Sequence, residues 1–172
     1  HPHKNYRRAL EAWALYHRRR PEYKLVIAGL RGFEPETVER AREELGLRDS
    51  VAILGWIPQE RLLELYATAR AFLYPSTFEG FGLPVLEAMA AGLPVACSDI
   101  PPLRNLASGA AILFDPQDTE AIGAAISAVM DNQPTRDRLS DAGPRRAASF
   151  SWRSTAERTL RYLTDAARER AG

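Results

Sequence analysis

Short apolar segments alternate with segments of helical periodicity along this chain, and this alternation constrains the fold more than any other feature. The apolar segments comprise residues 24–29, 51–55, 71–75, 94–98 and 111–114. Short strands that are apolar on both sides are typical of a parallel sheet whose two faces are covered by helices. The sequence therefore predicts an α/β domain with right-handed crossovers, and a ligand site at the carboxyl ends of its strands.

Length and charge narrow the class of protein. The chain has 172 residues, about the size of one domain, so we expect a single domain over residues 1–172. Its net charge of +1 gives no support for nucleic-acid binding. The one cysteine, Cys97, lies in an apolar segment and is expected to be a small core residue. A chain that forms no internal disulfide fits a reducing compartment, so we expect a cytoplasmic location.

The stretch over residues 75–94 organises the rest of the chain. It begins where an apolar segment ends, and it opens an apolar helix near Leu83. Pro84 is tolerated there because a first-turn N–H has no helical partner. Gly80 and Gly82 are expected to let the backbone turn tightly and approach a ligand. The free N–H groups at the start of the helix predict an anion site.

Two glutamates interrupt this stretch, Glu79 and Glu87. Glu87 lies one turn after Leu83, about 6 Å along the helix axis, which is near the spacing of a diphosphate and its ribose. Its two oxygens can accept both ribose hydroxyls, and Glu79 lies where a sugar on the diphosphate would be. The residues alone leave a second interpretation open, in which Glu87 is a paired core carboxylate and Glu79 is a solvated loop charge.

From Glu79 the sequence reads Glu-Gly-Phe-Gly-Leu-Pro-Val-Leu-Glu-Ala-Met-Ala-Ala-Gly-Leu-Pro-Val. These two glutamates, separated by seven residues in this context, resemble the signature of retaining family 4 (group 1) glycosyltransferases. The likeness runs from Lys4 to Trp152. It implies the Rossmann-like, donor-binding C-terminal half of a GT-B glycosyltransferase. Such an enzyme transfers a sugar from a nucleotide diphosphate sugar to a glycan or lipid-linked acceptor in polysaccharide biosynthesis, with retention and without a metal or other cofactor.

The resemblance also assigns roles to individual residues. Lys4, in Pro-His-Lys-Asn, would contact the donor diphosphate, although by residue type alone it is a solvent-facing lysine. Ile57 would read the base through its backbone, where the alternative is a plain hydrophobic turn. Glu79 would orient the sugar, and Lys4 with the helix start would stabilise the leaving diphosphate. The implied donor site comprises Lys4, Ile57, Ser76, Glu79, Gly80, Phe81, Gly82, Leu83 and Glu87, with Glu79 and Lys4 as catalytic groups.

The resemblance implies elements outside these residues. The family has an N-terminal acceptor domain, and it has a mid-sheet strand just before the Lys-Asn loop. Without that strand, the segment at 24–29 is expected to have an open edge. The last helix crosses toward the N-terminal domain in the family, so residues 166–172 are expected to pack poorly. Two positions depart from the family: its upstream arginine has no counterpart, and Asn105 stands where a glutamate is usual.

Other functions stay open on the sequence. One is a non-catalytic nucleotide-binding or interaction domain, and a second is a sugar-nucleotide epimerase of related architecture. The chain contains no Gly-x-Gly-x-x-Gly, which counts against a dinucleotide oxidoreductase. Arg31 is expected to be a solvated arginine rather than a phosphate ligand. Peripheral association of the parent enzyme with the inner face of the membrane also stays open.

Overall fold

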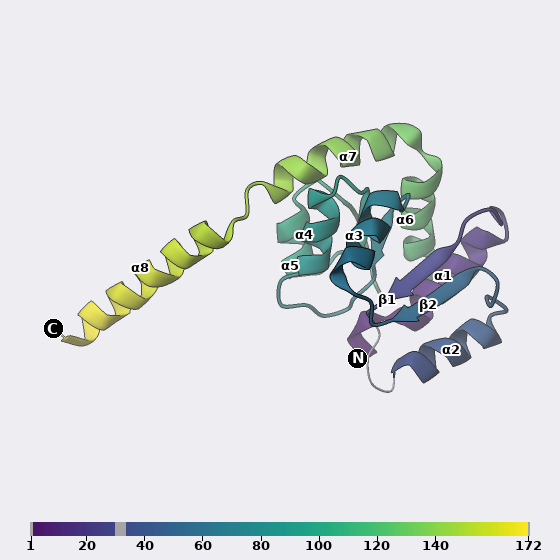
Figure 1. Cartoon of the computed structure of the whole chain (residues 1–172), viewed down its shortest axis with the longest axis horizontal. Helices are drawn as coiled ribbons and strands as arrows, with labels where there is room; N and C mark the ends of the chain where they lie inside the picture. Colours follow the sequence, from purple (N-terminus) through teal and green to yellow (C-terminus); the bar gives the residue numbers. More distant parts are fainter. Residues whose placement is uncertain (1, 30–33, 172) are drawn as a thin grey trace.

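A computed structural model of the chain describes residues 2–29 and 34–171 (Figure 1). It has the predicted strands and helices in the predicted order, preceded by a short 3-10 helix that the sequence did not predict. Arg31 lies outside the described residues. The elements are η1 (Pro2–Lys4), α1 (Tyr6–His17), β1 (Leu25–Ala28), α2 (Glu34–Glu44), β2 (Val51–Gly55), α3 (Gln59–Thr68), β3 (Phe72–Tyr74), α4 (Leu83–Ala90), β4 (Val95–Ser98), α5 (Pro101–Ala107), β5 (Ile112–Phe114), α6 (Thr119–Asp131), α7 (Gln133–Ala147) and α8 (Trp152–Ala171).

The strands pair in parallel, and within the described residues they form two sheets. One sheet is β1–β2, with Leu25 opposite Val51, and the other is β3–β4–β5. The predicted parallel α/β class is confirmed. Among the described residues β1 pairs with β2 alone, so the predicted open edge of β1 is confirmed there. The expectation of helices on both faces holds for β4, whose residues are all buried. The strands β1–β2 are less covered, since Val26 is 42% exposed and Leu54 is 38% exposed.

Helix α1 connects the two sheets through side-chain packing. Tyr16 of α1 shares one core with Ile27 of β1 and Phe114 of β5, and α1 also packs along α6. Near the amino ends of β1 and β3, the Arg70 guanidinium lies 5.3 Å from the centroid of the Tyr23 ring, a cation–π contact. Packing therefore joins β1–β2 to β3–β5 in the part of the chain that the structure describes.

A second core lies between the β3–β5 sheet and helices α4 and α5. Val85 and Met89 of α4, Leu103 of α5 and Cys97 of β4 are fully buried in it. Burial raises the pKa of the Cys97 thiol to about 12, so the thiol stays protonated. Cys97 is therefore a small core residue, as the sequence predicts.

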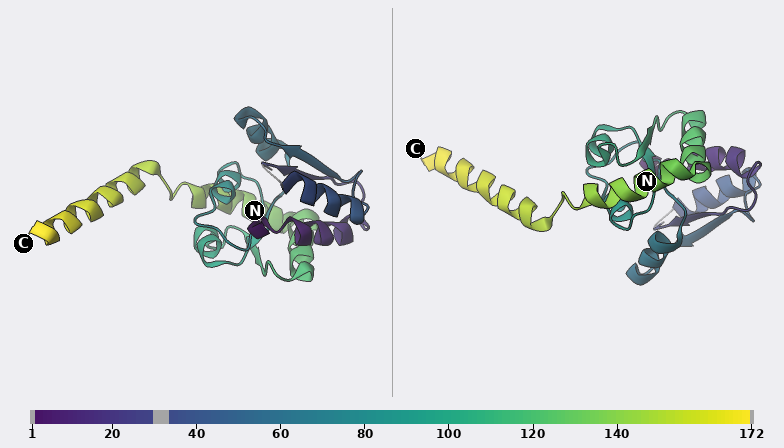
Figure 2. Two further views of the ribbon diagram at one scale, coloured as in Figure 1. Left: turned by 90° about the horizontal axis from the view of Figure 1, so that it is seen from below. Right: turned by 90° about the horizontal axis from the view of Figure 1, so that it is seen from above.

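Helix α8 projects away from the rest of the molecule in every view (Figures 1 and 2). Residues 152–168 are exposed throughout, and Trp152 and Leu160 are 79% and 66% exposed. The sequence predicts poor packing only for residues 166–172, of which Gly172 lies outside the described residues. The structure confirms poor packing for residues 166–168, shows the same exposure back to residue 152, and does not describe the side chains after residue 168.

Removal of α8 should leave the stability of the remaining chain almost unchanged. A chain that ends after Ser151 should melt within about 2 °C of the intact chain, because α8 contributes no buried side chain among residues 152–168. Phe150→Ala is the matched control and should melt lower, because the half-buried Phe150 ring packs edge-on against Phe81 at 5.9 Å. Thermal melts followed by circular dichroism test this. An equal drop in the two variants would contradict it.

Candidate functional site

The first residues of the described chain are tied to the loop between β3 and α4. The carbonyl of His3 accepts a hydrogen bond from the Thr77 N–H at 2.7 Å. The side chain of Asn5 is buried, and its Nδ2 donates to the carbonyl of Pro75 at 3.1 Å and to that of Pro116 at 2.6 Å. Asn5 itself has a φ of 57°, a left-handed conformation that asparagine tolerates. These contacts bring η1 to the carboxyl ends of β3 and β5.

Lys4 meets Glu79 and Tyr74 at this junction. Lys4 Nζ lies 2.7 Å from Glu79 Oε1 and donates to the Tyr74 hydroxyl at 3.0 Å. The Tyr74 hydroxyl in turn donates to Glu79 Oε1 at 2.8 Å. The side chain of Lys4 is 28% exposed and that of Glu79 is 13% exposed. Lys4 is therefore not a solvent-facing lysine, and Glu79 is not a solvated loop charge.

These contacts set the charges of the group. Burial lowers the pKa of Lys4, but the hydrogen bonds with Glu79 and Tyr74 outweigh it and raise the pKa above its ordinary 10.5. Burial raises the pKa of Glu79, but Lys4, Tyr74 and Ser76 outweigh it and hold the pKa below its ordinary 4.5. Burial also raises the pKa of Tyr74. At neutral pH the site thus holds an ammonium, a carboxylate and a protonated phenol.

Helix α4 begins beside this group, and its start needs one of the two predicted glycines. Gly82 precedes the helix with a φ of 102°, and a Cβ there would lie 2.4 Å from Leu103 Cδ2. Gly80 has no such φ, and a Cβ there would meet nothing within 4 Å. The predicted tight turn is confirmed at Gly82, whereas neither φ nor protein packing requires a glycine at Gly80. The close approach to a ligand stays a prediction at both positions. Pro84 has no N–H, and the N–H groups of Val85 and Leu86 donate to the Gly82 carbonyl at 2.9 and 3.3 Å. In the first turn this leaves the N–H of Leu83 to face an anion.

Glu87 lies one turn along α4, on its exposed face. The Tyr66 hydroxyl of α3 donates to Glu87 Oε2 at 3.2 Å. Burial and the charge of Glu87 raise the pKa of Tyr66, so this hydroxyl keeps its proton. Glu87 is therefore not a core carboxylate, and that alternative is wrong.

The other predicted site residues lie around these two carboxylates. Ser76 is buried, Phe81 and Leu83 are exposed, and Ile57 is half-buried in the loop after β2. Within the described part of the chain, no hydrogen bond or ion pair joins Ile57 or Glu87 to the pair of Lys4 and Glu79. The structure thus brings Lys4, Ser76 and Glu79 together and places Glu87 and Ile57 apart from them.

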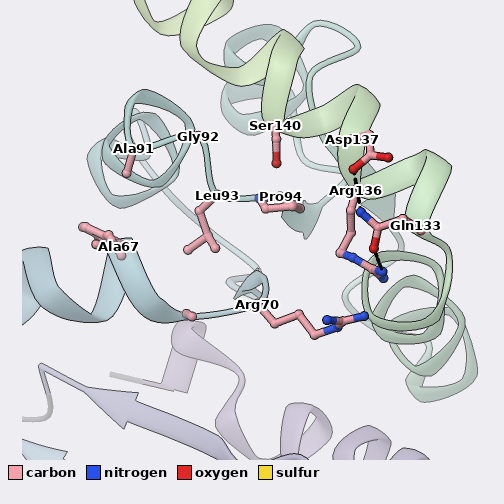
Figure 3. A pocket seen from close by; sticks show the side chains of 12 residues that line it. Ala67, Arg70, Ala91, Gly92, Leu93, Pro94, Gln133, Arg136, Asp137 and Ser140 are labelled. Atoms are coloured by element: carbon pink, nitrogen blue, oxygen red, sulfur yellow. Dashed lines mark hydrogen bonds between the residues drawn. The ribbon is translucent and has the colours of Figure 1, made fainter.

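A hollow of about 330 Å³ lies at the opposite edge, at the amino ends of β3 and β4 (Figure 3). Arg70 and Arg136 line it, but their donors bind the carbonyls at the end of α6: Arg136 Nη1 donates to Met130 O at 2.6 Å and Arg70 Nε to the same oxygen at 3.0 Å. Both cations therefore cap a helix. A second, apolar hollow lies along β5 and α6. None of the predicted site residues lines either hollow.

Two residues of this site were not assigned roles from the sequence. Tyr74 lies within the predicted strand 71–75, which gives no signal for its hydroxyl. Asn5 follows Lys4, and its residue type is the signal that could have identified it. Asparagine tolerates a left-handed conformation, and its side-chain amide can donate to two carbonyls.

The described residues contain no group of three or more His, Cys, Asp or Glu side chains placed to hold a metal ion. Nor does the described part of the chain include a helix that is both long and apolar enough to cross a membrane.

Comparison with known proteins decides the family. Residues 1–146 match the family model of glycosyl transferases group 1. The chain belongs to that family. It is 38% identical over 161 residues to the O-antigen chain mannosyltransferase B of Escherichia coli, with 92% of this chain and 42% of that protein aligned. It is 35% identical over 128 residues to the D-inositol 3-phosphate glycosyltransferase of Corynebacterium urealyticum, with 73% of this chain and 30% of that protein aligned.

Solved structures agree on the fold. Sucrose-phosphate synthase from Thermosynechococcus elongatus superposes with a TM-score of 0.83 at 28% identity, over 96% of this chain and 44% of that one. The C-terminal domain of a group 1 glycosyltransferase from Francisella tularensis superposes with a TM-score of 0.77 at 19% identity, over 87% of this chain and 80% of that one. The predicted C-terminal half of a GT-B architecture is confirmed. This chain spans less than half the length of the curated relatives described above.

Replacement of the two glycines should have unequal effects. Gly82→Ala should lower the unfolding free energy by about 1–3 kcal/mol, because a left-handed φ and contact with buried Leu103 both oppose a Cβ. Gly80→Ala, the matched control two residues away, should change it by less than about 0.5 kcal/mol. Urea unfolding of the three proteins measures this. Similar losses in both variants would contradict the assignment of strain to Gly82.

The ion pair of Lys4 and Glu79 should give a pH-dependent stability difference between wild type and Glu79→Gln. The lowered pKa of Glu79 means that its contribution is present above 4.5 and is lost as pH falls through the folded-state pKa. The raised pKa of Lys4 means that its contribution is present below 10.5 and is lost as pH rises through the folded-state pKa. Between these limits we expect a difference on the order of 1 kcal/mol by urea unfolding. A difference that stays constant at both extremes would contradict the pairing.

Proposed function

We propose that this chain is the donor-binding half of a retaining glycosyltransferase that transfers a sugar from a nucleotide diphosphate sugar. The observation that carries the proposal is the partly buried ion pair of Lys4 and Glu79 just before the start of α4, with Glu87 one turn along that helix. This arrangement offers the Lys4 ammonium and the Leu83 N–H for a diphosphate, with one carboxylate before the start of α4 and one after it in the sequence. Membership of the group 1 family supports the same reaction class.

Each predicted site residue has a role in this proposal. Lys4 and the first turn of α4 bind the diphosphate and stabilise the charge that develops on it as it leaves. Glu87, held by Tyr66, accepts the ribose hydroxyls. Glu79 orients the sugar and stabilises positive charge at the reacting carbon. The remaining residues shape the donor site: Ile57 at the base, and Ser76, Gly80, Phe81, Gly82 and Leu83 along the diphosphate and sugar.

The acceptor belongs to a part of the protein outside these 172 residues. We place the acceptor site on an N-terminal domain, because the chain aligns with 42% and 30% of its two relatives above. The name of the first, an O-antigen chain mannosyltransferase, supports a hexose donor and a glycan or lipid-linked acceptor in polysaccharide biosynthesis. The enzyme works without a metal, in the cytoplasm or at the inner face of the membrane. A solved relative from Anabaena, in complex with UDP and glucose, supports a nucleotide-sugar donor.

Nucleoside diphosphates should bind to this chain in a way that depends on Glu87. Calorimetry with UDP, GDP and ADP identifies the base, and Glu87→Ala should weaken the best of them by at least about tenfold, because hydrogen bonds to a charged group contribute about 1.5–3 kcal/mol each. Glu79→Gln should weaken it less, since a bare diphosphate carries no sugar and the amide oxygen still accepts from Lys4. In the complete enzyme, Glu79→Gln should instead reduce turnover.

Glu157→Ala serves as the control, because this exposed glutamate lies on α8, away from the site. Equal losses in Glu87→Ala and Glu79→Gln would contradict the division of roles. Binding of nucleotide sugars without transfer by the complete protein would instead favour a non-catalytic binding domain.

A further inference from the structure

Tyr74 is the one member of the Lys4–Glu79–Tyr74 group that lies on a described strand. Its backbone pairs with Cys97 of β4, and its carbonyl accepts a hydrogen bond from the Ser98 hydroxyl at 3.3 Å. Its ring stacks on that of Phe72, with centroids 5.9 Å apart and planes 20° apart. The position of the Tyr74 hydroxyl is therefore set by the sheet and by its own strand.

Lys4 and Glu79 lie on less regular backbone. Lys4 ends the three-residue helix η1, and Glu79 lies in the loop between β3 and α4. A lysine side chain has four rotatable bonds, so it loses considerable entropy when a contact fixes its ammonium. Tyr74 contacts both residues: its ring centroid is 5.2 Å from Lys4 Nζ, and its hydroxyl lies within 3.0 Å of Lys4 Nζ and 2.8 Å of Glu79 Oε1.

We propose that Tyr74 is a positioning residue, which fixes the Lys4 ammonium for the donor's diphosphate and sets its distance from the Glu79 carboxylate. This inference rests on the proposed function, because it takes Lys4 as the diphosphate ligand. Active-site groups are held most closely when their supports lie on rigid elements. Here the phenol on β3 supports two groups that the loops supply.

The hydrogen-bond inventory of Lys4 agrees with this role. An ammonium has three hydrogens, and Lys4 donates two of them, to Tyr74 and to Glu79. The third hydrogen is available to a diphosphate oxygen without loss of the first two bonds. The hydroxyl keeps its proton near neutral pH, because burial raises the pKa of Tyr74, so it can accept from Lys4 and donate to Glu79 at once. Among the described residues, Tyr6 also responds to the charges of Lys4 and Glu79, and burial raises the pKa of Tyr6.

A double-mutant cycle tests the coupling between Tyr74 and Lys4. UDP and GDP affinities are measured by calorimetry for wild type, Tyr74→Phe, Lys4→Met and the double variant. Tyr74→Phe keeps the stacked ring and should weaken binding about threefold to tenfold, because the ammonium must then be ordered on binding. In the Lys4→Met background the same change should alter affinity by less than about twofold. Tyr162→Phe, on the exposed helix α8, is the matched control and should change nothing.

Nuclear magnetic resonance gives a readout that a role in folding alone would not move. The chain has two lysines, Lys4 and Lys24, so its side-chain ammonium groups give at most two signals. Without nucleotide, the Lys4 signal should be visible at low temperature in wild type, since two acceptors slow its exchange with water. It should be lost in Tyr74→Phe and kept in Tyr162→Phe, and Lys24→Arg assigns it.

The outcomes separate this inference from the proposed function. No effect of Lys4→Met on nucleotide affinity would overturn the diphosphate role of Lys4. A loss in Lys4→Met, together with equal losses from Tyr74→Phe in both backgrounds, would overturn the positioning role of Tyr74 alone. A Tyr74→Phe protein that binds nucleotides as tightly as wild type does, and that keeps the Lys4 signal, would also overturn the positioning role of Tyr74.

Discussion

The geometry of the site depends on the buried side-chain amide of Asn5. One nitrogen, Nδ2, donates to carbonyls that follow two different strands, at Pro75 after β3 and at Pro116 after β5. A buried carbonyl left without a donor costs about 1–3 kcal/mol, so these two bonds hold η1 against both loops. Because Lys4 is the preceding residue, the same bonds determine where its ammonium can reach. The contact of Lys4 with Glu79, across 75 positions of sequence, follows from the amide beside it.

The Lys4–Glu79 contact keeps both side chains in their charged forms. Each side chain is partly buried, and burial alone would drive both toward their neutral forms. Their mutual contact and the Tyr74 hydroxyl reverse that tendency, so the site keeps one full positive and one full negative charge side by side. In the proposed function, a diphosphate at the start of α4 would meet a cation that two hydrogen bonds already hold in place.

Local features of this fold could be predicted from the sequence, and features that depend on pairing between distant segments could not. Strands and helices were predicted because apolar periodicity is a local property, and the start of α4 was predicted because Gly82 and Pro84 act on their own backbone. The contact of Tyr74 with Lys4 joins segments 70 residues apart, and no local pattern encodes it. The burial of Glu79 was not predicted either, since the environment of a loop carboxylate depends on what packs over the loop. At Gly80 the fold itself does not account for the glycine, because no left-handed φ and no neighbouring protein atom requires it there.

The division of the described strands into two sheets affects what fixes the distance between the two ends of the proposed donor site. Ile57, at the base end, follows β2, whereas Glu79 and Glu87 follow β3. Hydrogen bonds in a β-ladder fix a register, but apolar packing has no preferred direction and permits small displacements. In the described residues, contacts on α1, the Arg70–Tyr23 pair and helix α3 set the span between the base end and the diphosphate end. In α3, the Tyr66 hydroxyl donates to Glu87 and the Tyr66 ring packs against Phe72. The length of a nucleotide is fixed by covalent bonds. A bound nucleotide would therefore restrict the displacement of one sheet relative to the other.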